Sequence, residues 1–218
     1  VRQFPDIKLI IMDDAFQHRS VIPKLSILLF DYNQLFKKQT MLPSGNMREH
    51  FFNKSRADIF IVTKSPEKLS NQDKSNVLNK LKPKKYQEVY YSHIKYNMLI
   101  PFNKSQKQLP ILDKNLSVLL FCGIANPKAL IDHLENIVKE VIPVKFPDHH
   151  FFTKNDLFNI LEIYAEIINT EKCIITTEKD AIRLQSTESS EILHSSALFY
   201  LPINIDFNES KEQFIKQI

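Results

Sequence analysis

Glycine is almost absent from this sequence, because only Gly45 and Gly123 occur among its 218 residues. Neither begins the pattern G-x-x-x-x-G-K-[ST], since Gly45 is followed by NMREH and Gly123 by IANPK. A loop of that pattern holds nucleotide phosphates with its backbone amides. Chemistry that needs a glycine-rich phosphate loop is therefore not encoded in these residues.

Cysteine and long apolar runs are scarce as well. Cys122 and Cys173 are the only cysteines, and each lies in a short apolar run. We predict that both are small core residues of a reducing compartment, and neither a disulfide nor a zinc site. No stretch reaches the roughly 18 apolar residues that a membrane-spanning helix needs, and we expect no signal peptide.

No charge of one sign dominates the chain. The net charge of +4 comes from scattered lysines, and the densest clusters, KPKK at 82–85 and NKSQKQ at 103–108, are short. Because no aromatic-rich binding motif accompanies them, we predict solvated loops and no nucleic-acid partner. A weak attraction to an anionic membrane surface stays open.

Short apolar runs alternate with helical patterns along the chain. Nearly continuous apolar runs are typical of strands buried on both faces, and they predict strands at 8–12, 25–30, 57–63, 88–102 (one or two), 115–125, 173–177 and 197–203. Apolar residues at helical spacing predict helices at 70–83, 126–138, 155–169, 179–185 and 210–218. Asn126 is the expected N-cap of its helix, with Pro127 at the first helical position. The helix at 155–169 places one apolar face on Leu157, Ile160, Leu161, Tyr164 and Ile168.

This alternation predicts an α/β fold, a largely parallel sheet flanked by helices. The composition changes near 83–108, where Lys, Tyr and Asn are frequent. We therefore expect a core lobe at 1–88, linker strands at 89–105, and a second, smaller α/β lobe at 106–218.

The run KLIIM is followed directly by Asp13 and Asp14, and then by Gln17 and His18. In an open parallel sheet, ligands bind beyond the carboxyl ends of the strands. An acidic residue at that place can hold Mg²⁺ in an enzyme that uses nucleoside triphosphates. The alternative is an aspartate that caps the next helix, for which one carboxylate would suffice.

A second polar cluster, Asp148, His149 and His150, lies between aromatic residues in VKFPDHHFF. A histidine beside an aspartate can act as a general base, support one, or ligate a metal. A structural histidine is the alternative.

Two further stretches are candidate anion sites. In LPSGNMREH, at 42–50, Arg48 can fork onto a phosphate or carboxylate, or can simply pair with Glu49 on an exposed loop. In TTEKD, at 176–180, hydroxyls and amides at a helix start can receive an anion, although helix capping alone explains them as well.

Six motifs in order resemble the tetraacyldisaccharide 4'-kinases, the lipid A 4'-kinases of Gram-negative bacteria, in their Bacteroidetes form. They are DDAFQHR, LPSGNMREH, RADIFIVTK, FCGIANP, FPDHHFF and TTEKDAIRL. The resemblance implies a P-loop NTPase-like fold and transfer of the γ-phosphoryl group of ATP to the 4'-hydroxyl of a tetraacyldisaccharide 1-phosphate lipid A precursor. It also implies work as a peripheral enzyme on the cytoplasmic face of the inner membrane. We expect a monomer.

The same resemblance implies a role for each candidate residue. Asp13 and Asp14 correspond to the acidic pair that organises Mg²⁺, and Asp14 also counts among the catalytic residues. Gln17 and His18 line the ATP site beside them. Arg48 and Glu49 correspond to the pair near the acceptor's sugar and phosphate end. His149, next to Asp148, corresponds to the histidine that supports a catalytic carboxylate. Phosphoryl transfer depends on charge compensation and alignment, which fits carboxylates, an arginine and a histidine that converge from two lobes.

The sequence also departs from the family pattern. The phosphate loop, the carboxylate base and a membrane-seeking helix are expected upstream of Val1, so we predict a C-terminal part of such a kinase that is inactive alone. Ser44 stands where alanine is usual, and His50 where proline often follows the Arg-Glu pair. These changes bear on the shape of the loop at 42–50.

Two other functions are alternatives to the kinase. A metal-dependent phosphoesterase would use the Asp-His-His triplet, but its second, glycine-rich histidine motif is missing here. A non-catalytic remnant would bind lipid or a partner, and binding of ATP–Mg²⁺ by the full-length protein separates it from the kinase.

Overall fold

The computed structural model describes residues 6–38, 40, 49–103, 108–185, 192–193, 196–208 and 211–218. The chain divides into two compact units, the first formed by 1–95 with 205–218 and the second by 96–204. The two units contain equally many residues, so the second is not the smaller one. Residues 205–218, which the sequence placed in the C-terminal lobe, belong to the first unit.

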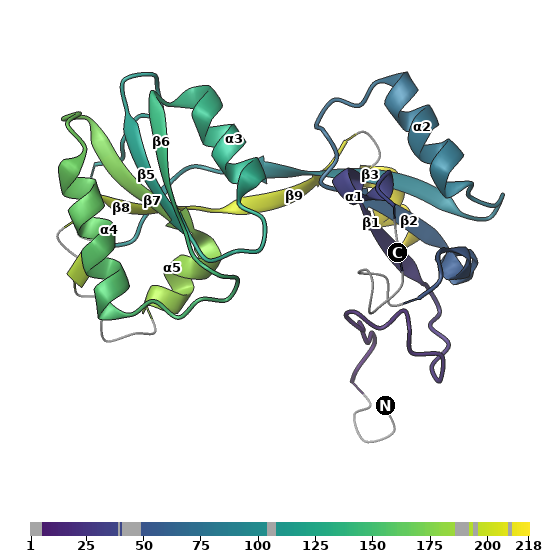
Figure 1. Cartoon of the computed structure of the whole chain (residues 1–218). Helices are drawn as coiled ribbons and strands as arrows, with labels where there is room; N and C mark the ends of the chain where they lie inside the picture. The colour runs from purple at the N-terminus through teal and green to yellow at the C-terminus, as the bar shows by residue number, and fades with distance from the viewer. Residues whose placement is uncertain are drawn as a thin grey trace. The chain divides into compact units, whose positions relative to one another are not determined.

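The first unit contains a four-stranded sheet in the order β1-β2-β3-β9 (Figure 1). β1 pairs with β2 and β2 with β3, both in parallel register. The strands are β1 (Ile27–Asp31), β2 (Ile59–Thr63), β3 (Glu88–Tyr96) and β9 (Ile203–Phe207). The helices are α1 (Tyr32–Leu35), the 3-10 helix η1 (Phe51–Arg56), α2 (Asn71–Leu81) and α6 (Lys211–Gln217).

Local signals explain where α2 begins and ends. Ser70 and Asp73 form a capping box at its start, and Lys82 adopts the left-handed conformation after its last residue, just before Pro83. Val77 and Leu81 then face a core that also contains Phe60 of β2. The helix predicted at 70–83 is therefore confirmed.

The second unit contains a five-stranded sheet in the order β4-β8-β7-β5-β6, parallel except for the β4–β8 pair. Its strands are β4 (Ile100–Pro101), β5 (Ser117–Cys122), β6 (Glu140–Lys145), β7 (Lys172–Thr177) and β8 (Leu198–Leu201). Its helices are α3 (Lys128–Ile137), α4 (Lys154–Glu166) and α5 (Glu178–Gln185). The predicted α/β class is confirmed in both units.

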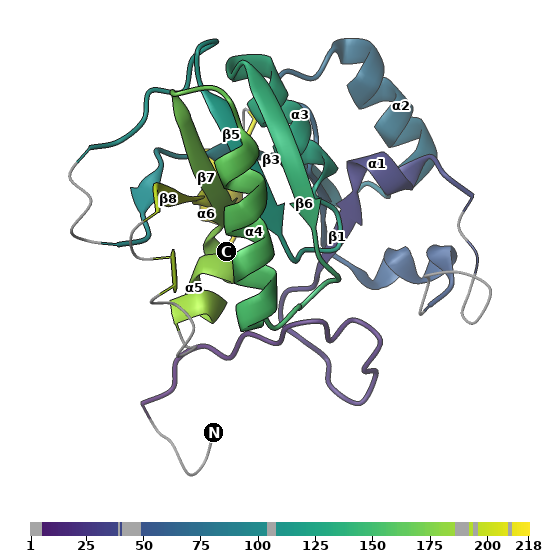
Figure 2. The same ribbon diagram turned by 60° about the vertical axis from the view of Figure 1, so that its left-hand side comes forward.

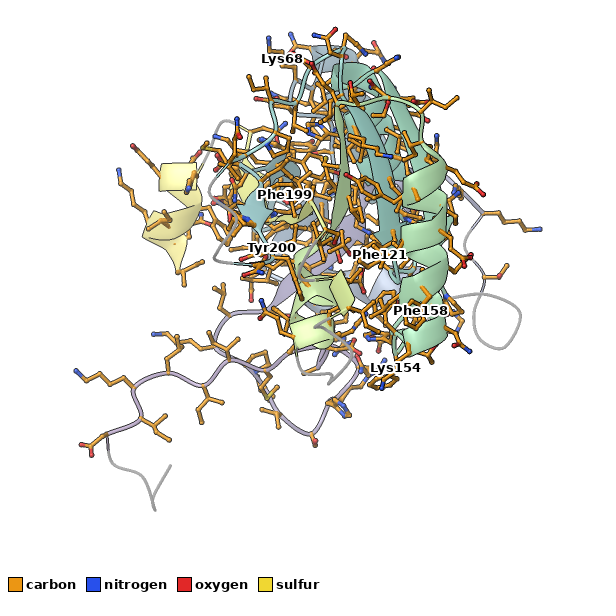
Figure 3. The ribbon with its side chains drawn as sticks, turned by 90° about the vertical axis from the view of Figure 1, so that its left-hand side faces the viewer. Lys68, Phe121, Lys154, Phe158, Phe199 and Tyr200 are labelled. Atoms are coloured by element: carbon orange, nitrogen blue, oxygen red, sulfur yellow. The ribbon has the colours of Figure 1, made fainter. Side chains whose placement is uncertain are left out.

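Helices cover both faces of this second sheet, as Figures 1 and 2 show. On one face, α3 contributes Leu130 and Leu134 to a core with Val118, Leu120 and Ile175. On the other face, α4 and α5 pack over alternate residues of the same strands. The core on this face includes Leu119, Phe121, Leu157, Ile160, Ile174 and Leu184. Figure 3 marks Phe121 and Phe199 in the sheet and Lys154 at the first turn of α4. Strand β5 is completely buried because both of its faces are covered.

Both cysteines are free and buried in this sheet, as predicted. Burial raises the pKa of Cys122 to about 11 and that of Cys173 to about 12. In the part of the chain that the structure describes, no helix is long and apolar enough to cross a membrane.

Three details of the predicted elements are wrong. Residues 8–12 form no strand, and their side chains lie exposed, with Leu9 at 70% and Ile11 at 84%. A strand needs a neighbour for its hydrogen bonds, and no described segment pairs with this run. Ile168 is 97% exposed because α4 ends at Glu166, before that residue could join its apolar face. At α3 the N-cap is Pro127, one residue later than expected, although Asn126 Oδ1 still accepts from the Lys128 amide at 3.2 Å.

Candidate functional site

The acidic pair lies on an irregular, exposed segment of the first unit and not at the end of a strand. Asp14 has φ 46°, in the left-handed region that aspartate adopts more readily than most residues. Gln17 Nε2 donates to the Asp14 carbonyl at 2.7 Å, and the His18 amide donates to the Ala15 carbonyl at 2.9 Å. These bonds form a compact turn that keeps Gln17 and His18 next to the two aspartates.

Glu49 links this turn to η1. Its carboxylate accepts Nη2 of Arg19 at 2.6 Å and also forms an ion pair with Arg56. Burial alone would raise the pKa of the Glu49 carboxyl, but the hydrogen bonds and charges of Arg19 and Arg56 outweigh burial and lower that pKa. Glu49 is therefore held in its ionised form.

Arg56 fixes the same turn from a second side. Its Nη2 donates to the Phe16 carbonyl at 2.9 Å, and its guanidinium lies 4.3 Å from the centre of the Phe16 ring. The motif DDAFQHR is thereby attached to the start of RADIFIVTK through contacts that sequence spacing does not predict. Arg48, the predicted partner of Glu49 at the acceptor, lies outside the described residues.

The second unit brings three motifs together around Asp180, in α5. The side chain of Asp180 is completely buried. Its Oδ2 accepts the Gly123 amide at 3.0 Å and the Thr177 hydroxyl at 2.6 Å, and its Oδ1 accepts Nη1 of Arg183 at 2.9 Å. Three donors satisfy this carboxylate, and the guanidinium balances its charge.

His149 joins the same cluster from FPDHHFF. Its backbone amide donates to the Gly123 carbonyl at 3.1 Å, and its Nδ1 lies 2.8 Å from Nη2 of Arg183. Its Nε2 lies 3.7 Å from Oδ2 of Asp148. The ring of His149 is 76% exposed, so it is anchored on one edge and accessible on the other.

Position 123 requires a small residue because three segments meet there. An added Cβ would lie 3.2 Å from the Pro147 carbonyl oxygen, 3.2 Å from Cβ of His150 and 3.3 Å from Oδ1 of Asp180. The glycine of FCGIANP therefore permits the approach of FPDHHFF and TTEKDAIRL to the end of β5.

His150 differs from its neighbour, because it serves the start of α4. Its Nε2 lies 2.9 Å from Oδ2 of Asp156, and its ring stacks on Phe146. Asp156 also forms a capping box with Thr153. Burial alone would raise the pKa of Asp156, but the bonds from Thr153 and His150 outweigh it and lower that pKa. His150 thus has a structural role at the start of α4, which is the alternative to a catalytic role for a histidine in this cluster.

Asp180 and Arg183 are the site residues that sequence reasoning missed. The motif TTEKDAIRL is recognisable in the sequence, but the sequence alone assigns no role to its individual members. The available signal was the spacing of Asp180 and Arg183, three residues apart on one helix face. What the sequence could not show is that the guanidinium also reaches Gly123 and His149.

The donor set of Asp13 and Asp14 suits a magnesium ion shared with a nucleotide. Mg²⁺ is commonly bound through one or two carboxylates together with water and phosphate oxygens, and less often by a cage of protein ligands. Among the described residues, no group of three or more His, Cys, Asp or Glu side chains could hold a metal ion. Asp13 and Asp14 supply two carboxylates of this kind.

Two surface hollows lie elsewhere. One, of about 570 Å³, is lined by Tyr32, Phe36, Asn76, Asn79 and Lys80. The other, of about 470 Å³, lies in the second unit between β6 and the end of α4, where Ile142, Ile163 and Ile168 line it. Neither lining includes the two aspartates or His149.

A family model described as Tetraacyldisaccharide-1-P 4'-kinase matches residues 1–218 of the chain. A Tetraacyldisaccharide 4'-kinase of Flavobacterium psychrophilum is 40% identical over 216 residues, which cover 97% of this chain and 58% of the relative. That of Bacteroides thetaiotaomicron is 35% identical over 224 residues, which cover 98% and 58%. The chain thus spans a little over half the length of these curated relatives.

The fold has a solved counterpart. The crystal structure of LpxK from Aquifex aeolicus, in complex with ATP, matches with a TM-score of 0.54 and 22% identity, over 94% of this chain and 55% of that one. At this identity the likeness concerns the fold, which agrees with the predicted fold class.

Proposed function

Because the chain belongs to the tetraacyldisaccharide-1-P 4'-kinase family, we propose that the protein containing it transfers the γ-phosphoryl group of ATP to the 4'-hydroxyl of a tetraacyldisaccharide 1-phosphate. The observation that carries this proposal is the family match over the whole chain, in which all six motifs lie. ATP is supported by the solved counterpart, which was crystallised with it. The acceptor is supported by the name that the curated relatives share.

The first unit supplies the groups for the nucleotide and the acceptor. Asp13 and Asp14 would hold Mg²⁺, which, when bound, neutralises charge on the β- and γ-phosphates. Gln17 and His18, held beside them by the turn at 14–18, would line the ATP site. Arg48 and Glu49 would lie near the acceptor's sugar and phosphate end, where the guanidinium of Arg48 could bind the phosphate.

The second unit supplies His149 and Asp148. In phosphoryl transfer the protein mainly positions groups and stabilises charge. His149 has an accessible ring edge and a fixed backbone, so it can orient a carboxylate that takes the proton of the acceptor hydroxyl.

We propose that the enzyme acts at a membrane, since a tetraacylated acceptor resides in a bilayer. We propose peripheral attachment at the cytoplasmic face of the bacterial inner membrane, and action as a monomer. The mild excess of lysine is compatible with attraction to an anionic surface.

The test is an assay of the full-length protein with γ-labelled ATP, Mg²⁺ and tetraacyldisaccharide 1-phosphate. The expected product carries the label on the 4'-oxygen, and Asp13→Asn together with Asp14→Asn should abolish its formation. An acceptor that already carries a 4'-phosphate is the matched control and should take up no label. Release of inorganic phosphate from phosphoesters without labelled lipid would favour a phosphoesterase and contradict the proposal. ATP–Mg²⁺ binding without transfer, or no binding, would favour a non-catalytic protein.

A further inference from the structure

Two acceptors besides His149 hold the guanidinium of Arg183. Its Nη1 donates to Oδ1 of Asp180 at 2.9 Å and to the Gly123 carbonyl at 3.2 Å. Asp180 is itself fixed by the Gly123 amide and the Thr177 hydroxyl. Arg183 is therefore a rigid donor, because its planar fork is oriented by two acceptors that cannot move independently.

The backbone of His149 is fixed by the same carbonyl. His149 has φ 60°, a left-handed conformation that costs free energy for a residue other than glycine unless its surroundings hold it. The Gly123 carbonyl accepts both the His149 amide and Nη1 of Arg183. The Gly123 carbonyl therefore holds the main chain of His149 directly and its ring through Arg183.

The contact between Arg183 and His149 decides where the imidazole carries its proton. A guanidinium has N–H donors and no acceptor, so Nδ1 of His149, 2.8 Å from Nη2, must offer its lone pair. In a neutral ring the proton then resides on Nε2. Nε2 is the nitrogen that faces a carboxylate, 3.7 Å from Oδ2 of Asp148.

We infer that Arg183, oriented by Asp180, is a positioning residue that holds His149 as the Nε2–H tautomer. This inference rests on the proposed function and deepens it. His149 then donates a hydrogen bond from Nε2 and has no free lone pair with which to take a proton. In the proposed reaction His149 therefore orients and polarises the carboxylate base. The proton of the acceptor hydroxyl goes to that base and not to the imidazole.

The tautomer can be measured by NMR on the whole chain with ¹⁵N-labelled histidine, at about pH 8, where an ordinary histidine with a pKa near 6.5 is neutral. The spectrum of His149→Gln identifies the signals of His149. We expect a protonated Nε2 and a bare Nδ1 in the wild type. In Arg183→Met, the Nδ1 resonance should move toward that of a protonated nitrogen as the other tautomer becomes populated.

Lys179→Met is the matched control, because it removes a cation from the exposed side of the same helix. It should leave both His149 signals at their wild-type positions. A protonated Nδ1 in the wild type would overturn the inference. So would an unchanged Nδ1 resonance in folded Arg183→Met.

Kinetics of the full-length protein give an independent readout. Arg183→Met should lower kcat by about 10-fold or more, as loss of an orienting partner commonly does, while the KM for ATP stays within about twofold. Arg183→Lys should not restore kcat, because one ammonium group cannot reach Asp180, Gly123 and His149 together. Wild-type kcat in Arg183→Met would overturn the inference.

The two claims fail separately. A wild-type protein that transfers no phosphoryl group refutes the proposed function, whereas the NMR result still decides the tautomer. A wild-type protein that transfers the group but has Nδ1 protonated refutes the inference alone.

Discussion

The Gly123 amide donates to Oδ2 of Asp180 at 3.0 Å and so joins the end of β5 to the first turn of α5. The bond is buried, and the same carboxylate also receives Thr177 and Arg183. Asp180 is thus the shared support of the three motifs in the second unit.

Asp180→Asn should destabilise the second unit by about 3 kcal/mol. The amide cannot balance the charge of Arg183, and its NH₂ group would face other donors in a buried place. Urea denaturation followed by circular dichroism measures the loss. Asp132→Asn removes an exposed i,i+4 pair with Lys128 and should cost less than about 0.5 kcal/mol. Equal effects of the two substitutions would contradict this role of Asp180.

Gly123→Ala should cost about 1–3 kcal/mol, because its Cβ would press against backbone and buried side chains that have little room to shift. Gly123→Ser, which is larger, should cost more. The same denaturation experiment ranks the three proteins. An alanine variant as stable as the wild type would show that the close approach of the three motifs does not require glycine.

The sequence predicts most of the strands and helices of the second unit. It predicts few of the contacts that hold the candidate residues of the first unit in place. Strand β5 and helix α4 were predictable because a buried apolar run and a capped amphipathic helix are local patterns. The run at 8–12 has the same local pattern as β5, yet it forms no strand, since strand formation depends on a neighbour that lies outside the pattern. In the same way Arg183 stood in a recognised motif, but its contact with His149 joins residues 34 positions apart. Long-range side-chain contacts of this kind are not encoded in spacing.

Arg56→Gln should loosen the turn at 14–18. The substitution removes the ion pair with Glu49 and the contact with the Phe16 ring, and it weakens the bond to the Phe16 carbonyl. Loss of about 1 kcal/mol of local stabilisation corresponds to about fivefold faster exchange of the His18 amide. Hydrogen exchange followed by NMR measures the rate.

Lys64→Gln is the control for Arg56→Gln, because it removes an exposed ion pair with Asp31 in the same unit. It should leave the exchange of the His18 amide unchanged. Unchanged exchange in Arg56→Gln would show that the arginine does not hold the turn.

Asp156→Asn should remove a pH-dependent part of the stability. The folded state lowers the pKa of Asp156, so the carboxylate stabilises the fold in full above its unfolded pKa of about 3.9, and this contribution is lost as the pH falls through the lower folded value. The difference in unfolding free energy between wild type and variant should shrink as the pH falls from about 5 to 3, because Asp156 becomes protonated in the wild type. Urea denaturation across that range measures it. A difference that stays constant down to pH 3 would contradict the assignment.

The central claim is that His149 takes part in phosphoryl transfer, and the kcat of His149→Ala in the full-length protein tests it most directly. We expect kcat to fall about 10²-fold with the KM for ATP nearly unchanged, as loss of a group that assists proton transfer commonly produces. His133→Gln, which alters a histidine stacked on Tyr96 in the same unit, should keep wild-type kcat. A kcat of His149→Ala within a few-fold of the wild type would contradict the account.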